Sequence, residues 1–465
     1  MWEPVIGLEI HIQLQTKSKL FCSCKNSYGD PPNTNICPVC LGHPGTLPVL
    51  NWEAVKMATK LATALHCRIN PTSYFARKNY FYPDLPKGYQ ITQHKYPLAQ
   101  DGYIVLRSGK KIRIERLHLE EDSGKSIHTE EGTLIDFNRC GVPLAEIVTK
   151  PDISSPEEAV EFLKILRLVA IYTGVSDADM EKGNMRCDAN LSLKPADSGS
   201  LGVKTEVKNL NSFRFLARAL QYEIERQRKL LEAGGKVVQE TRGYDSHRGI
   251  TFTMRSKEEA HDYRYFPEPD LPPLVLSEEF LGKIKEGIGE LPWEKKSRFV
   301  EELGLDEDTA WVLCGEKEMA DLFEETLKHF PKPKELANWV KTEVMKLWKE
   351  GLRVTPIQLT KLLKMVEQGY ISRLKAKEVL EEVAKTGKNP EEIVEEKGLL
   401  QISDEASLRV IIEEVVREFP DKVEKYRSGK KGLLGFFMGQ VMRRTRGKAN
   451  PKIVNKILGE VLNGK

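Results

Sequence analysis

Hydrophobic and polar residues alternate cleanly in two stretches of the first 120 residues. Between Val5 and Leu14, one side of the chain is apolar and the other polar; the apolar side is Leu8, Ile10, Ile12 and Leu14, and the polar side is Glu9, His11 and Gln13. In the second stretch, from Lys111 to Glu120, Ile112 and Ile114 point inward, and Leu117 and Leu119 lie opposite His118 and Glu120. A period of two residues is typical of a strand with one buried face, so both stretches are predicted to be strands.

Helix signals interrupt the strands and then dominate. Ser155-Pro156 is a helix start with proline at the first helical position, and the helical pattern continues to Gly174. A second helix is expected from about Ser212 to Gly234, and a third cap signal stands at 403–405. We therefore predict an α+β fold with a mixed or antiparallel sheet in residues 1–290, an all-α helical domain in 291–400 and a small helical tail domain in 401–465.

The composition fits a globular protein of several domains. The chain has 465 residues, of which 40% are hydrophobic and 30% charged. The apolar runs are too short to span a membrane, and the N-terminus lacks the pattern of a secretory signal. We therefore expect a cytoplasmic protein.

Charge is distributed unevenly along the chain. The net charge is +3, but residues 421–465 contain twelve Lys/Arg and three Asp/Glu, a net of +9. The rest of the chain must then carry about −6. A basic tail on an acidic body favours contact with a polyanion. A solubilising terminal helix pair is the structural alternative.

Four of the eight cysteines fall within nineteen positions, namely Cys22, Cys24, Cys37 and Cys40. Two closely spaced pairs on turns are typical of a structural zinc knuckle, here at 22–40, because zinc prefers four tetrahedral ligands. Four thiolates would leave no open position for catalysis. Four unligated buried thiols are the alternative.

Acidic residues and histidines gather on the predicted strands. Glu9 and His11 share one strand face, and His118, Glu120 and Asp122 share another, with Glu121 beside them. The most informative residue is Glu146, because leucine, alanine, isoleucine and valine flank it and a buried carboxylate needs a partner or a metal. Asp188 follows on a later segment. Together these residues would suit Mg²⁺ and nucleotide-dependent phosphoryl transfer, although Glu120 to Asp122 alone could be a solvated loop.

Two lysines are candidate phosphate ligands, Lys78 and Lys208. The segment ending in Gly124-Lys125-Ser126 is not a complete phosphate loop, because Leu119 stands where that motif requires glycine. The chain also shows no nucleophile elbow and no Gly-Gly-Ser-Ser amidase stretch. A reaction that consumes ammonia would therefore need another chain to produce it.

Several of these segments together resemble the B subunit of the aspartyl/glutamyl-tRNA amidotransferases. The segments that carry the resemblance are 5–11, 37–42, 77–90, 117–125, 262–270, 438–442 and 447–451, and it extends over essentially the whole chain. Ala76 is a departure, because the family usually has aspartate there. The resemblance implies a cradle domain, a helical domain and a tail.

The resemblance also implies a two-step ligase reaction. ATP phosphorylates the side-chain carboxylate of Glu or Asp esterified to tRNA(Gln) or tRNA(Asn), and ammonia then displaces the phosphate. By resemblance, His11, Glu121 and Glu146 hold Mg²⁺, with Glu9 and Asp188 nearby. Lys78 and Lys208 are expected to meet phosphate, and Glu206 to lie beside the ammonia path or the substrate.

The expected partners are a glutaminase A subunit, which supplies ammonia through a channel, a small C subunit and the misacylated tRNA. Five tail residues are expected to contact the tRNA backbone: Arg443, Arg444, Arg446, Lys448 and Lys452. Two alternatives stay open at this point. One is a non-catalytic, zinc-stabilised tRNA-binding subunit, and the other is a metal-dependent nuclease built on the acidic cluster.

Overall fold

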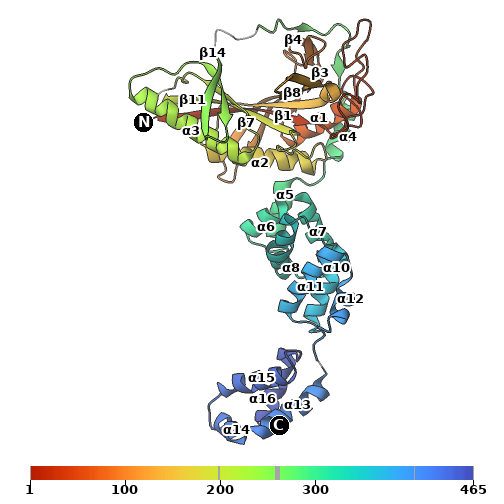
Figure 1. Cartoon of the computed structure of the whole chain (residues 1–465), viewed down its shortest axis with the longest axis vertical. Coiled ribbons are helices and arrows are strands. Elements are labelled where there is room, and N and C mark those ends of the chain that lie inside the picture. Colours follow the sequence, from red (N-terminus) through yellow and green to blue (C-terminus); the bar gives the residue numbers. More distant parts are fainter. Residues whose placement is uncertain (1, 197–198, 257–261, 403, 464–465) are drawn as a thin grey trace. The chain divides into compact units, whose positions relative to one another are not determined.

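The chain folds into two compact units in a computed structural model, which describes residues 2–196, 199–256, 262–402 and 404–463. The first unit is Met1–Pro292 and the second is Trp293–Lys465. Figure 1 shows the first as a sheet with helices and the second as helices alone. The predicted α+β fold class is confirmed.

A mixed sheet forms the N-terminal unit, in the strand order β14-β13-β12-β11-β1-β10-β7-β6-β2. Its strands are β1 (Trp2–Gln13), β2 (Arg68–Ile69), β6 (Ala99–Val105), β7 (Lys111–Glu121), β10 (Pro143–Thr149), β11 (Met185–Pro195), β12 (Thr205–Lys208), β13 (Glu240–Asp245) and β14 (Ile250–Ser256). Neighbours run antiparallel except β12 and β13, which are parallel. The sheet places β10 between β1 and β7, an arrangement on which the site depends.

Shorter strands pair beside the main sheet. They are β3 (Thr72–Ser73) with β16 (Leu274–Val275), β4 (Ala76–Asn79) between β5 (Tyr89–Thr92) and β15 (Phe266–Pro267), and the hairpin β8 (Lys125–Thr129) with β9 (Gly132–Asp136). The helices of this unit are α1 (Trp52–Ala64), η1 (Phe137–Arg139), α2 (Pro156–Tyr172), α3 (Phe213–Glu232) and α4 (Glu278–Glu286). Figure 1 shows α1, α2 and α3 along one face of the sheet.

The alternation of the sequence decides which side chains face the helices. Leu8, Ile10 and Ile12 of β1 are at most 1% exposed. In β7 the apolar positions change phase after Ile114, and there the register with β10 shifts, so that Glu115 is an extra residue. This β-bulge turns both apolar pairs of β7 toward the core.

Capping side chains fix the helix starts that the sequence predicts. The Ser155 side chain accepts a hydrogen bond from the Glu158 backbone N–H at the start of α2, where Pro156 occupies the first turn. Ser212 caps α3 in the same way. Both caps satisfy backbone donors that a helix start leaves unpaired.

The C-terminal unit consists of helices around two hydrophobic clusters. The helices are α5 (Pro292–Glu301), α6 (Glu307–Cys314), α7 (Lys317–Leu327), α8 (Pro333–Trp339), η3 (Val340–Val344), α9 (Met345–Lys349), α10 (Pro356–Glu367), α11 (Arg373–Thr386), α12 (Pro390–Glu396), α13 (Glu405–Glu418), α14 (Pro420–Arg427), α15 (Leu433–Arg444) and α16 (Pro451–Leu462). One cluster comprises buried residues between 299 and 394, and the other between 408 and 462.

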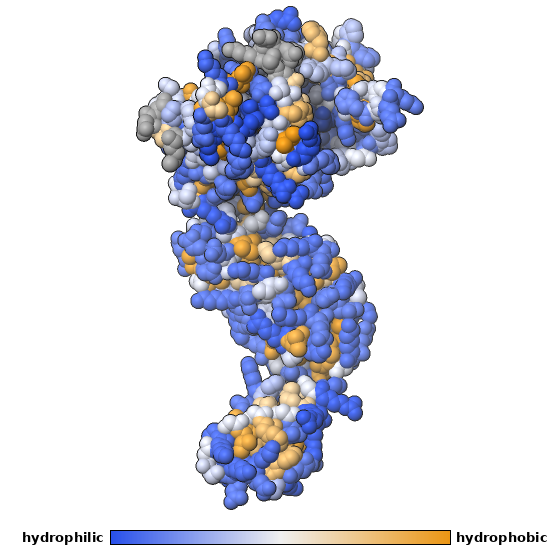
Figure 2. Space-filling view, turned by 60° about the vertical axis from the view of Figure 1, so that its left-hand side comes forward, coloured by the Kyte–Doolittle hydropathy of each residue, from blue (hydrophilic) through white to orange (hydrophobic). Residues whose placement is uncertain are grey.

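The sequence-based division into three domains, with limits at 290 and 400, stays a prediction. Asp404 caps α13, as expected, by accepting from the Ser407 backbone N–H, while residue 403 lies outside the described part. Figure 2 shows apolar side chains scattered among hydrophilic ones on the visible surface. Among the described residues, no helix has the length and apolar character needed to cross a membrane.

Candidate active site

Ionisable side chains line the face of the sheet that α1, α2 and α3 leave uncovered. In the register of β1 with its neighbours, Glu9 lies opposite Asp188 of β11, and His11 lies opposite Arg186 of β11 and Glu146 of β10. Residues directly opposite one another in a sheet project to the same side. The register therefore brings charges from separate parts of the sequence into one row.

The centre of this row is a compact group of two histidines and two glutamates. Nε2 of His11 lies 3.1 Å from Oε1 of Glu120 and 3.3 Å from Oε2 of Glu146. Nε2 of His118 lies 3.3 Å from the same Glu146 oxygen and 3.6 Å from Oε2 of Glu120. Ligand atoms of Glu9, His11 and Glu146, and of His118, Glu120 and Glu146, lie within 4.8 Å of one another. This is the spacing of side chains that can share one ion.

The electrostatics of the group are dominated by burial and by mutual charge. Burial lowers the pKa of His11, but hydrogen bonds and charges from Glu120 and Glu146 outweigh it and raise that pKa to about 10. Burial and the Glu146 charge oppose ionisation of Glu120, yet both histidines hold its pKa at about 2. Burial and the Glu146 charge raise the pKa of Glu9. The glutamates therefore depend on nearby positive charge, which the histidine protons supply here and which a bound cation could supply in their place.

The donor set fits a divalent metal. Carboxylate oxygens are the ligands that Mg²⁺ prefers, and a site of few protein ligands leaves positions for water and phosphate. His11, Glu120 and Glu146 converge from three adjacent strands of a rigid sheet. A histidine ligand must be neutral, so an ion here would displace the proton that the glutamates stabilise.

Glu121 is not brought into this group. Its side chain lies on the opposite face of β7 from Glu120, as alternation along a strand requires. Its carboxylate accepts from the ammonium of Lys87 and, over 2.9 Å, from the backbone N–H of Ile91. The structure thus places Glu120 where the family resemblance had placed Glu121 next to His11 and Glu146.

Lys208 lies along the same face, and Lys78 lies on β4 of the small three-stranded sheet. Lys208 on β12 lies 2.8 Å from an oxygen of Asp188 and 3.2 Å from one of Glu206. Burial lowers the Lys208 pKa, but these two carboxylates more than offset it, so the pKa is raised and the ammonium stays charged. Nζ of Lys78 on β4 lies 4.8 Å from the ring centre of Tyr263, and the charges of Glu120 and Glu146 hold its pKa above the usual value against burial.

Sequence reasoning missed Arg186, which lies two positions before Asp188 and therefore on the same face of β11. Its Nη2 donates to Oδ2 of Asp122 over 2.7 Å. The period-two pattern could have found it. Tyr263 and Tyr265 carried no such signal, because only the fold brings their segment beside β4. Ala76, where the family usually has aspartate, is a buried position of β4.

The four clustered cysteines form a second candidate metal centre. Sulfur atoms of Cys22, Cys24, Cys37 and Cys40 all lie within 4.8 Å of one another, and none forms a disulfide. Four sulfurs around zinc at bond lengths of about 2.3 Å are about 3.8 Å apart, so the arrangement fits a tetrahedral ion. The ligand count indicates a structural role.

The five basic tail residues differ in their surroundings. All five are exposed. Arg444 is engaged within the fold: its guanidinium pairs with Glu418 and lies 3.3 Å from Glu414. In the part of the chain that the structure describes, the other four form no ion pair; they are Arg443, Arg446, Lys448 and Lys452.

Comparison with known proteins places this arrangement in a family. Residues 4–282 match the GatB/GatE catalytic domain, and residues 321–462 match the GatB domain. The chain belongs to the GatB family of amidotransferase subunits.

Curated relatives match over their full length. The chain is 54% identical to the B subunit of the aspartyl/glutamyl-tRNA(Asn/Gln) amidotransferase of Thermodesulfovibrio yellowstonii over 471 residues, covering 99% of each chain. It is 53% identical to the protein of that name from Persephonella marina, again over 99% of each, and 52% identical to that of Thermotoga maritima, over 100% of this chain and 99% of the relative.

Proposed function

We propose that this chain is the synthetase-like subunit of a tRNA-dependent amidotransferase, a carbon–nitrogen ligase that converts Glu on tRNA(Gln), Asp on tRNA(Asn), or both, into the amide. The observation that carries the proposal is the buried group of His11, His118, Glu120 and Glu146 in a chain of this family. Burying a charged side chain lowers the stability of a fold, and a subunit that only bound tRNA would not need several such side chains together.

The reaction has two steps. A side-chain carboxylate oxygen of the tRNA-bound residue attacks the terminal phosphorus of ATP, and the bond to the bridging oxygen breaks to release ADP. Ammonia then attacks the acyl carbon, the carbon–oxygen bond to phosphate breaks, and the surplus proton leaves with a base. ATP is needed because a free carboxylate is a poor electrophile. The acyl phosphate is a good one, because phosphate is a good leaving group.

His11, Glu120 and Glu146 would hold the Mg²⁺ ion, with Glu9 and Asp188 beside them. Bound there, the ion supplies charge neutralisation to phosphate oxygens, which is the main requirement of phosphoryl transfer. Glu9, whose pKa is raised by burial and by the Glu146 charge, is the carboxylate beside this group that would accept the proton from attacking ammonia.

The two lysines flank this centre with positive charge. Lys78 is within electrostatic reach of Glu120 and Glu146, and Lys208 bridges Asp188 and Glu206. Both stay protonated, which suits orientation of ATP phosphates. Glu206, whose carboxylate accepts from the Thr241 hydroxyl over 2.7 Å, would lie beside the ammonia path or the substrate.

Three further assignments complete the proposal. Zn²⁺ is held by the four cysteines as a structural ion. The partners are the glutaminase A subunit and the small C subunit, since the name of the relatives denotes one part of a larger enzyme. The tail binds the tRNA backbone through Arg443, Arg446, Lys448 and Lys452, and cytoplasmic translation is the setting.

The test is ATP- and glutamine-dependent conversion of Glu-tRNA to Gln-tRNA by the reconstituted enzyme. Glu146→Gln removes one charge from the central group and is expected to lower turnover at least ~100-fold, as loss of a metal ligand or its support does. Glu115→Gln is a matched control, because it makes the same change at an exposed position of β7. Unchanged turnover in Glu146→Gln would contradict the assigned site, and tRNA cleavage in the presence of Mg²⁺ would favour a nuclease instead.

A further inference from the structure

Lys19 is a lysine whose side chain is completely buried. The residue is 0% exposed, and its Nζ donates to the backbone oxygen of Asn35 over 2.7 Å and contacts Sγ of Cys40 at 3.6 Å. In the described part of the chain, no carboxylate oxygen lies within ion-pair distance of this ammonium. A neutral carbonyl and a sulfur are thus its polar contacts among the described residues.

A buried ammonium with no counter-ion is strongly unfavourable, and such lysines are almost never found without a partner. The neighbouring cysteines can supply the missing negative charge. Four thiolates around one Zn²⁺ carry a net charge of −2, so the loaded cluster is itself an anion. We propose that Lys19 is the counter-charge of the zinc–cysteine cluster and positions its ligands. This inference rests on the zinc site proposed above.

Lys19 also connects the two halves of the knuckle. Its backbone N–H donates to the oxygen of Cys24 over 2.9 Å, at the end of the first cysteine pair. Its ammonium reaches Asn35, which precedes the second pair, and Cys40, which ends it. A charged donor on a ligand sulfur orients that sulfur and draws electron density from it, the usual function of groups around a metal's ligands.

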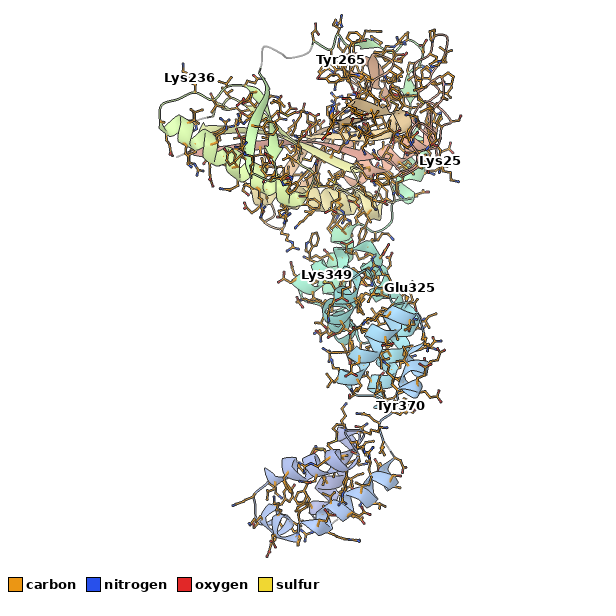
Figure 3. The ribbon with its side chains drawn as sticks, viewed as in Figure 1. Lys25, Lys236, Tyr265, Glu325, Lys349 and Tyr370 are labelled. Carbon is orange, nitrogen blue, oxygen red and sulfur yellow. The ribbon has the colours of Figure 1, made fainter. Side chains whose placement is uncertain are left out.

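The experiment compares zinc affinity in three variants of the full chain by competition with a chromophoric chelator. Lys19→Met removes the charge and keeps the side-chain length, and Lys19→Arg keeps the charge. Lys25→Met is the matched control: Lys25 follows Cys24 in the same knuckle, but its side chain is 63% exposed and pairs with Asp30. Figure 3 shows Lys25 at the edge of its unit.

Lys19→Met is expected to weaken zinc binding about 10- to 100-fold, the range for loss of a group that supports a ligand. Lys25→Met and Lys19→Arg are expected to stay within about threefold of the unmodified chain, well below that range. Equal losses in Lys19→Met and Lys19→Arg would show a packing effect and overturn the proposal, as would equal affinities for Lys19→Met and Lys25→Met. An insoluble Lys19→Met is replaced by Lys19→Gln, with the same comparison.

A second measurement does not depend on affinity. With zinc bound, Lys19→Met should lower the unfolding midpoint of the chain in urea. After zinc is chelated, the same substitution should leave the midpoint unchanged or raise it, because the orphaned charge is gone. A loss of the same size in both states would overturn the proposal. Absence of zinc from the unmodified chain would refute the zinc site itself, a different result.

Discussion

Nε2 of His11 lies 3.1 Å from Oε1 of Glu120, although their strands β1 and β7 are not neighbours in the sheet. Strand β10 lies between them, and its Glu146 contacts His11 as well, at 3.3 Å. The two side chains therefore reach over the central strand and meet above it. The candidate metal group exists only when three strands, distant in sequence, are in register.

The first prediction distinguishes the role of Glu120 from that of Glu121. Glu120→Gln should weaken Mg²⁺ binding and lower amidation by roughly 100-fold or more, because loss of even a supporting group around a metal costs about 10- to 100-fold. Mn²⁺ binding followed by electron paramagnetic resonance, and turnover of the reconstituted enzyme, measure the two effects.

Glu121→Gln serves as the contrast, since Glu121 pairs with Lys87 on the other face of β7. It should leave Mn²⁺ binding within a few-fold of the unmodified chain. If Glu121→Gln abolished metal binding and Glu120→Gln did not, the ligand set read from the structure would be wrong.

This contrast also shows what sequence can and cannot provide. Period-two alternation alone puts His118 and Glu120 on one face of their strand, and the apolar residues that flank Glu146 identify it as a carboxylate in an apolar setting. The choice of Glu121 rests on resemblance, whereas alternation along β7 puts its side chain on the opposite face from Glu120. No local pattern in the sequence contains the strand order. The proximity of His11 to Glu120 follows only once β10 is known to lie between β1 and β7.

The same distinction holds for smaller features. The helix caps at Ser155 and Ser212 follow from the chemistry of a few adjacent residues, so the sequence predicts them. The engagement of Arg444 by Glu414 and Glu418 joins α15 to α13 and depends on tertiary packing. For that reason the sequence alone predicts the same tRNA contact for Arg443 and Arg444.

The second prediction concerns pH. The Arg113 guanidinium donates to both oxygens of Asp152, over 2.6 and 2.8 Å, and these bonds hold the Asp152 pKa below its usual value of about 3.9. A carboxyl whose pKa is depressed by folding stabilises the fold above its unfolded-state pKa, and this contribution disappears as the pH falls through the folded-state pKa.

Asp152→Asn should therefore lower the urea midpoint at about pH 7, and the difference from the unmodified chain should shrink as the pH falls below about 3.9. Urea titrations of both proteins at a series of pH values measure it. A difference that stayed constant with pH would mean that the Asp152 charge contributes nothing.

The third prediction is a thiol count. Burial raises the pKa of the Cys140 thiol and of the Cys67 thiol to about 12, so neither is a reactive thiolate near neutral pH. Chelation should unfold the knuckle that zinc holds together, and so add four reactive thiols within the time in which these two stay protected. A chromogenic disulfide reagent, used together with zinc analysis, gives the count. In a Cys22→Ser/Cys24→Ser variant the added count should fall to at most two.

The last prediction concerns tRNA binding by the tail. An arginine that contacts a tRNA phosphate displaces a counter-ion from the tRNA. Substituting that arginine therefore weakens binding and reduces the slope of log affinity against log salt concentration by about one. Arg443→Ala and Arg446→Ala are expected to behave in this way, because both side chains are exposed and neither forms an ion pair among the described residues.

Arg444→Ala is the control. It makes the same change one position away, where Glu414 and Glu418 already pair with the guanidinium. It should leave the salt slope nearly unchanged. Filter binding over a range of KCl concentrations distinguishes them, and a slope reduced in Arg444→Ala but not in Arg443→Ala would contradict the assignment of the tRNA contact to Arg443.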